Sequence, residues 1–147
     1  MSDEVPQLEL LTDASEHWYR QAQPDAVVDR GQVNFLAFRL TPRDAGKLSG
    51  ARCRKQTAQG AYDEHVARGR RSKGTWALTV GEIADTGAAH GITLACYDDS
   101  AVPADPPPST GHTYIDATAV DKAVYDLVRV AFAKRANDRG CVYAPPE

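Results

Sequence analysis

Alternating apolar and polar residues predict several short strands in this chain. In one run, Trp76, Leu78 and Val80 alternate with Thr75, Ala77 and Thr79. Because successive side chains of a strand point to opposite faces, such a run has one face suited to a core. Turn-forming residues before or after most of these runs support the same assignment. The expected strands are residues 33–40, 75–80, 92–97 and 112–116.

Helical spacing and capping residues predict helices between these strands. A helix often begins after a Thr whose side chain caps it, and it is helped by an acidic residue three positions later. Glycine just beyond the last turn is a common stop signal. The longest stripe of apolar residues runs from Val120 to Ala131, followed by Lys134, Arg135 and Arg139. The expected helices begin near Thr41, Thr57, Thr79 and Thr118 and end near Gly46, Gly69, Gly91 and Gly140.

This order of elements predicts the α+β class. We expect a small mixed sheet of four or five short strands, packed against three or four helices that include a long C-terminal amphipathic helix. Residues 1–12 are expected to form an N-terminal tail, with Leu8, Leu10 and Leu11 available for a short edge element, and residues 13–147 a single globular domain. The proline-rich segment 98–111 is expected to be an extended surface loop. The pattern does not predict the strand order.

Composition favours a compact cytoplasmic protein. The chain has 147 residues, of which 42% are hydrophobic and 25% charged, as in ordinary globular domains. It contains no apolar run near the roughly 20 residues that cross a bilayer, and its polar N-terminus lacks the pattern of a secretory signal. Three widely spaced cysteines fit neither a disulfide framework nor a structural zinc site. We therefore expect no membrane partner, no metal and no other cofactor.

The charge distribution is uneven. Residues 43–73 carry nine basic and three acidic side chains, although the whole chain has a formal net charge of −3. Such a segment could bind nucleic-acid phosphates, dock on an acidic protein surface or simply form a solvated face. Tyr62 is the only aromatic residue in the segment, which weakens the case for stacking on single-stranded nucleic acid.

Two clusters are candidates for chemistry. His112, Tyr114 and Asp116 have strand spacing and would share one face, where an imidazole beside a carboxylate can act as a general base. The alternative is the solvated face of an edge strand, with Asp116 capping the long helix. Residues 49–52 are predicted to form a loop that either merely exposes basic residues or holds an anion through a hydroxyl and a guanidinium. The candidate binding residues are Arg20, Ser49, Arg52, Arg54, Lys55, Arg70 and Arg71.

Four short runs resemble a group of small uncharacterised bacterial proteins. They are Trp18-Tyr19-Arg20-Gln21, Ala37-Phe38-Arg39-Leu40-Thr41-Pro42-Arg43-Asp44, Leu48-Ser49 and Gly74-Thr75-Trp76. The resemblance covers about the first half of the chain. It implies no activity, fold or catalytic residue.

The leading hypothesis is a non-catalytic partner-binding accessory or immunity-type protein, whose basic central patch meets an acidic protein surface. It leads because the sequence contains no recognisable catalytic motif. One alternative is a small enzyme acting on a nucleotide or phosphorylated substrate, and another is a nucleic-acid-binding protein that uses residues 43–73. The enzyme would use side chains from separate segments, namely Arg20, Ser49, Arg52, His112 and Asp116.

Overall fold

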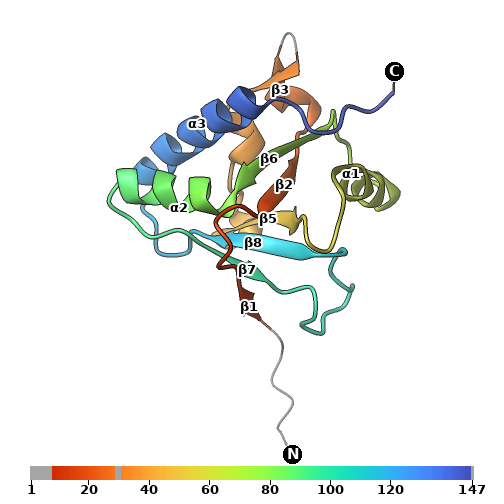
Figure 1. The fold of residues 1–147 in the computed structure, drawn as a ribbon, viewed down its shortest axis with the longest axis horizontal. Coiled ribbons are helices and arrows are strands. Elements are labelled where there is room, and N and C mark those ends of the chain that lie inside the picture. The colour runs from red at the N-terminus through yellow and green to blue at the C-terminus, as the bar shows by residue number, and fades with distance from the viewer. Residues whose placement is uncertain (1–7, 29–30, 147) are drawn as a thin grey trace, which may run out of the picture.

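The computed structural model describes residues 8–28 and 31–146, and its centre is a six-stranded antiparallel sheet (Figure 1). The strand order is β1-β7-β8-β5-β2-β6, so segments far apart in sequence lie side by side. A separate hairpin pairs β3 with β4. The α+β class is confirmed, and every described strand pairing is antiparallel, where a mixed sheet was expected. The strands are β1 (Glu9–Leu10), β2 (His17–Gln21), β3 (Val27–Val28), β4 (Gln32–Val33), β5 (Lys47–Arg52), β6 (Thr75–Thr79), β7 (Ala95–Asp98) and β8 (His112–Asp116).

Helices lie on both sides of the strands. Helices α2 and α3 lie together on one side, and α1 lies on the other (Figure 1). The Thr57 and Thr79 hydroxyls accept hydrogen bonds from Gly60 N and Glu82 N, so the predicted starts of two helices are confirmed. Among the described residues, the helices are α1 (Ala58–Ala67), α2 (Val80–Ala89) and α3 (Lys122–Arg139), with the short 3-10 turns η1 (Pro24–Ala26), η3 (Phe35–Phe38) and η4 (Pro42–Asp44).

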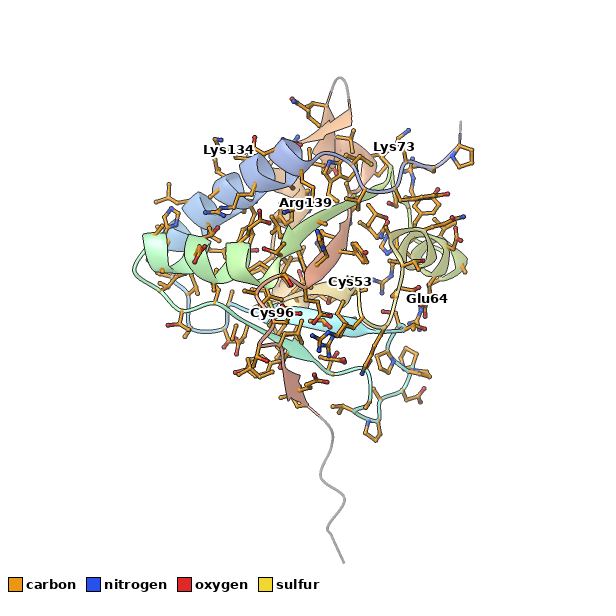
Figure 2. The ribbon with its side chains drawn as sticks, viewed as in Figure 1. Cys53, Glu64, Lys73, Cys96, Lys134 and Arg139 are labelled. Atoms are coloured by element: carbon orange, nitrogen blue, oxygen red, sulfur yellow. The ribbon has the colours of Figure 1, made fainter. Side chains whose placement is uncertain are left out.

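The core lies between the sheet and α3. Phe132 of α3 packs edge-on against Phe38, with ring centroids 5.6 Å apart, and both side chains are fully buried. Burial of such a side chain contributes about 1.5–3 kcal/mol to stability. Figure 2 labels Arg139 at the end of α3. Arg139 ties this last turn to the sheet, because it donates to the Ala77 carbonyl (3.0 Å) and pairs with Glu82 (2.8 Å). The predicted long C-terminal helix is thus the main cover of the core.

The strand expected over residues 33–40 is wrong. Residues 35–38 form the 3-10 turn η3, because the Asn34 side chain accepts a hydrogen bond from Leu36 N (2.8 Å) and caps the turn. The capping role expected for Thr118 is also wrong. Its amide and hydroxyl donate to Asp116 at 3.0 and 2.6 Å, and α3 begins later, after Asp121.

The loop expected over residues 49–52 is in fact the second half of β5, a central strand. Gly50 is there because a Cβ would lie 2.3 Å from the indole of Trp18. The indole fills that space and donates to the Thr113 carbonyl (3.1 Å). The edge-strand alternative for residues 112–116 is wrong as well, because β8 lies between β5 and β7.

The N-terminal segment forms one edge of the sheet as β1, and β6 forms the other edge. Glu9 and Leu10 pair with β7, and Leu11 is buried. Most of the expected tail, residues 1–7, lies outside the described residues, so the domain boundary after residue 12 stays a prediction. In the described part of the chain, no helix combines the length and apolar character that crossing a membrane requires.

Arg52 is the centre of a buried ion cluster at this side of the sheet. Its guanidinium lies 2.8 Å from Glu16 and 3.0 Å from both Asp98 and Glu9, and Lys55 approaches Asp98 to 2.7 Å. The Glu16 and Asp98 side chains are each only 1% exposed. Buried charges are tolerated when they are paired in this way, so the cluster joins the N-terminal segment to β5 and β7.

The cluster predicts a loss of stability in acid. Burial alone would raise the pKa of Asp98, but hydrogen bonds from Lys55, Ser100 and Arg52 outweigh it and hold the pKa well below its usual range. Burial would also raise the pKa of Glu16, but hydrogen bonds from the Arg52 side chain and the Arg54 amide outweigh it and lower that pKa. Carboxylates with depressed folded-state pKa values stabilise the protein above their unfolded pKa of about 4, and this contribution is lost as the pH falls below it.

We therefore expect the free energy of unfolding, measured by urea denaturation, to fall between pH 5 and pH 2. The Asp98→Asn variant removes one titrating group and should show a shallower dependence over the same range. Equal slopes for the two proteins would contradict the assignment of this effect to Asp98.

Candidate functional site

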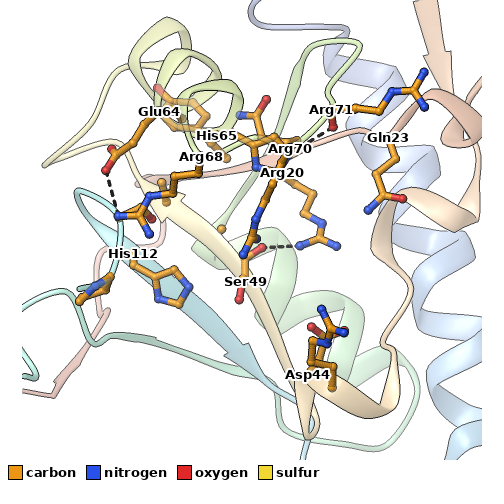
Figure 3. A pocket seen from close by; sticks show the side chains of 18 of the residues that line it. Arg20, Gln23, Asp44, Ser49, Glu64, His65, Arg68, Arg70, Arg71 and His112 are labelled. Atoms are coloured by element: carbon orange, nitrogen blue, oxygen red, sulfur yellow. Dashed lines mark hydrogen bonds and ion pairs between the residues drawn. The ribbon is translucent and has the colours of Figure 1, made fainter. Parts of the chain in front are cut away.

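A cleft of about 1250 Å³ lies over β2, β5 and β8, between α1 and the proline-rich loop (Figure 3). Six arginines line it, together with four carboxylates and two histidines. The arginines are Arg20, Arg39, Arg43, Arg68, Arg70 and Arg71; the carboxylates are Asp25, Asp44, Glu64 and Asp99; and the histidines are His65 and His112.

Small residues of β5 form the floor. Ser49, Gly50 and Ala51 line the cleft, and Ala51 stands opposite Tyr19 of β2 on one side and His112 of β8 on the other. Directly opposed residues of an antiparallel pair share a face, so Tyr19, Ala51 and His112 lie in one row. The methyl group in the middle of this row leaves room for a ligand above the sheet.

Helix α1 supplies one wall through a single face. Ala61, His65 and Arg68 recur at helical spacing and all line the cleft. The chain then turns at Gly69, whose φ of +82° is a conformation that glycine adopts readily. This turn brings Arg70 and Arg71 back to the cleft. The His65 ring lies 3.2 Å from the Arg71 carbonyl and supports the turn.

Arg20 occupies a gap between strands. β2 and β5 are paired at only two positions, Trp18–Arg52 and Tyr19–Ala51. Beyond them the Arg20 side chain, in place of a backbone amide, donates to the Ser49 carbonyl (2.6 Å), and its Nε donates to the Ala37 carbonyl (2.9 Å). The half-buried guanidinium is therefore held by neutral acceptors.

The cleft has an excess of uncompensated positive charge. Arg39 lies 3.3 Å from Asp25, and Arg68 lies 3.6 Å from Glu64. Asp44 is engaged with the Thr41 amide and hydroxyl. Within residues 8–28 and 31–146, the other four arginines have no carboxylate within 4.0 Å; they are Arg20, Arg43, Arg70 and Arg71.

The pKa values of Arg20 and His65 are both lowered by burial and by the positive charge of nearby arginines. Burial lowers the pKa of the Arg20 guanidinium; Tyr125 and Asp44 oppose this effect, and the charges of Arg39 and Arg70 add to it. Burial also lowers the pKa of His65, against a hydrogen bond with the Arg71 carbonyl, and the charges of Arg70 and Arg20 lower it further. Both groups would be stabilised in their charged forms by an anion in the cleft.

His112 and Asp99 face the cleft from the other side. The Nδ1 atom of His112 is hydrogen bonded to an Asp99 carboxylate oxygen, and both residues line the cleft. Their side chains are 24% and 29% exposed. No other described residue forms a hydrogen bond with the His112 ring, which leaves its Nε2 atom available to a ligand or water.

The fold brings together some of the residues predicted from sequence. Arg20, Ser49, Arg70, Arg71 and His112 all line the cleft. Three predicted cations do not line it but are engaged with carboxylates, Arg52 in the buried cluster, Arg54 with Asp13 (2.9 Å) and Lys55 with Asp98 (2.7 Å).

Tyr114 and Asp116 also lie outside the cleft lining. Tyr114 is buried beside Tyr97, with the Lys47 ammonium 5.1 Å from its ring. Asp116 accepts hydrogen bonds from Thr118. Of the three predicted catalytic residues, His112 alone borders the cleft.

Sequence reasoning missed several lining residues. The spacing of Ala61, His65 and Arg68 was a usable signal, because it marks one face of a helix that ends in a basic turn. Asp99 carried no such signal, because its partner lies 13 positions away and only the pairing of β7 with β8 brings them together. Arg39 and Arg43 reach the cleft through the turns η3 and η4.

In the part of the chain that the structure describes, no three His, Cys, Asp or Glu side chains are grouped to hold a metal ion. No known family model, curated protein or solved structure matches this chain.

Proposed function

We propose that this protein binds a small phosphorylated molecule of the nucleotide class in the arginine-lined cleft. The observation that carries the proposal is the half-buried Arg20 guanidinium, which is held by two backbone carbonyls and forms no ion pair with a described carboxylate. A buried charge without a counter-charge costs stability, and a bound phosphate would offset this cost. Guanidinium groups also match the geometry of phosphate oxygens.

The shape of the site favours a small ligand over a protein surface. This open cleft of about 1250 Å³ is larger than the roughly 300–1,000 Å³ of common small-molecule pockets, so it has room for a nucleotide with its bound water. Arg20 and Ser49 lie at its floor, where a flat acidic protein surface would not reach them (Figure 3). The partner-binding hypothesis is therefore less well supported by this geometry.

Binding of single-stranded nucleic acid is the weaker alternative. Proteins that hold single strands combine a basic groove with several aromatic stacking surfaces. Tyr19 is the only aromatic residue among the described lining residues. Arg52, Arg54 and Lys55 of the central basic segment are moreover engaged with carboxylates. The remaining unpaired cations suit one or two phosphates better than a long backbone.

The test is titration calorimetry with inorganic pyrophosphate, ADP and ATP as probes. We expect saturable binding of at least one probe, weakened roughly 10- to 100-fold by Arg70→Gln, because a hydrogen bond to a charged group contributes about 1.5–3 kcal/mol. Arg70 is exposed, so this variant should fold normally. Arg20→Lys, which keeps the charge but loses the planar fork, should weaken binding as well.

Arg135→Gln is the matched control, since it removes the same charge from α3, outside the cleft. Absence of binding for all three probes, or equal losses for Arg70→Gln and Arg135→Gln, would overturn the proposal. Tighter binding of a single-stranded oligonucleotide that also depends on Arg70 would favour the nucleic-acid alternative.

A further inference from the structure

We propose that the cleft is catalytic, and that His112, oriented by Asp99, is the general acid and base that hydrolyses a P–O bond of the bound ligand. This inference rests on the proposed function, because it needs a phosphorylated ligand beside the arginines. It adds a reaction and two residues with distinct roles: His112 as the catalytic residue and Asp99 as a positioning residue.

The pairing of β7 with β8 determines this arrangement. Asp98 stands opposite Thr113, and the next amide, Asp99 N, donates to the His112 carbonyl (3.2 Å). Asp99 and His112 are thus opposed and share a face. The neighbouring Asp98 points to the other face, where it joins the Arg52 cluster. Strand alternation gives two adjacent aspartates different surroundings, one buried among cations and one beside an imidazole at the cleft.

The hydrogen bond also determines which nitrogen is free. An ionised Asp99 accepts a hydrogen bond from Nδ1–H and so favours the tautomer in which Nε2 carries a lone pair. The Nε2 atom forms no hydrogen bond with another described residue, and the imidazole is accessible at the cleft. A neutral imidazole in this state can remove a proton from a water molecule.

The ring is not needed to hold the loop. Backbone hydrogen bonds already fix this part of the chain, from Asp99 N to the His112 carbonyl (3.2 Å) and from His112 N to the Ser109 carbonyl (3.0 Å). The side-chain pair is only partly buried, so it contributes little to stability. A structural role therefore does not account for an oriented imidazole at the cleft.

The positive charge that the reaction requires comes from guanidinium groups across the floor of the cleft from His112. Figure 3 shows His112 on one side of Ser49 and, on the other, the dashed bond from the Arg20 guanidinium to the Ser49 carbonyl. Arg70 also lines this cleft, and it has no described carboxylate partner. Preorganised guanidinium groups stabilise the negative charge of a phosphoryl group as its bond to the leaving oxygen breaks.

The reaction needs water as its only co-reactant. His112 Nε2 takes a proton from a water molecule, and the water oxygen forms a bond to phosphorus. The bond between phosphorus and the leaving oxygen breaks, and its electron pair stays on that oxygen. The imidazolium then returns the proton to the leaving oxygen, while Asp99 remains ionised and stabilises the imidazolium.

The experiment incubates the full-length chain with ADP, ATP and bis(p-nitrophenyl) phosphate and measures products by phosphorus NMR and nitrophenolate absorbance. We expect turnover of at least one probe, reduced about 10²- to 10⁴-fold by His112→Asn while calorimetric binding of that probe persists. His90→Asn, at the end of α2, is the matched control and should keep wild-type turnover.

Asp99→Asn separates positioning from structure. It should lower kcat more than it changes KM and should shift the acidic limb of the pH–rate profile, which an effect on folding alone would not do. Probes that bind without being hydrolysed, or equal turnover by His112→Asn and the wild type, would overturn this inference and leave the binding function intact. Failure of every probe to bind would overturn both.

Discussion

Replacing Arg52 by Met is expected to lower the free energy of unfolding by about 3–5 kcal/mol, the usual cost of leaving a buried charge without its partner. The Met side chain fills similar volume, so the loss comes chiefly from Glu16 and Asp98, both 1% exposed in the native protein. Glu16 would lose two hydrogen bonds of 2.8 Å. Urea denaturation at pH 7, followed by circular dichroism, measures the change.

Arg54→Met is the matched control for this experiment. Its side chain is 58% exposed and pairs with Asp13 at the surface, so the expected loss is at most about 1 kcal/mol. The triple variant Arg52→Met, Glu16→Gln, Asp98→Asn also removes the charges of the two carboxylates that lose their partner, and it should recover part of the lost stability. A similar loss for Arg52→Met and Arg54→Met would show that the buried cluster does not contribute as described.

Gly50→Ala is expected to cost about 1–3 kcal/mol through overpacking, at the upper end of that range. An added Cβ would lie 2.3 and 2.4 Å from two atoms of the Trp18 indole and 2.5 Å from the Tyr19 carbonyl oxygen. Trp18 is fully buried, and its Nε1 donates to the Thr113 carbonyl, so it has little room to move. The same strain should push β2 away from β5 and weaken binding of pyrophosphate or nucleotides in the cleft.

Gly60→Ala is the comparison for Gly50→Ala. At this helical position, the atom nearest the new Cβ is Gln56 Oε1 at 2.0 Å, which is the end of a flexible side chain that can move away, and alanine is intrinsically the better helix former. Thermal denaturation should show a clearly larger drop in Tm for Gly50→Ala than for Gly60→Ala. Equal values would mean that the contact with Trp18 does not decide the residue at position 50.

One sheet serves both stability and the proposed function because its two faces differ. In β5, Arg52 joins the buried ion cluster while Ala51 lines the cleft. In β7 and just beyond it, Asp98 pairs with Arg52 while Asp99 contacts His112. We therefore expect substitutions at Arg52 or Gly50 to affect stability more than ligand binding. Substitutions at Arg70 or His112 should affect ligand binding or turnover more than stability.

Elements with local signals could be predicted from the amino-acid sequence. Helices α1 and α2 begin where Thr57 and Thr79 cap them, and β6 follows from alternation between Thr75 and Thr79. These features depend on hydrogen bonds and side chains within a few residues of each other, so a linear pattern is sufficient. The same local reasoning failed at residues 33–40, where the cap supplied by Asn34 outweighed an alternating pattern.

The division of the cations between the cleft and the buried ion cluster depends on long-range packing. Arg52 and Arg70 look alike in the sequence, yet the first is buried among carboxylates and the second lies exposed at the cleft. The difference comes from strand order and register, which place Glu16, Arg52 and Asp98 together across three segments. Such pairings join residues 36 and 46 positions apart, and no local pattern of charge or hydrophobicity encodes them.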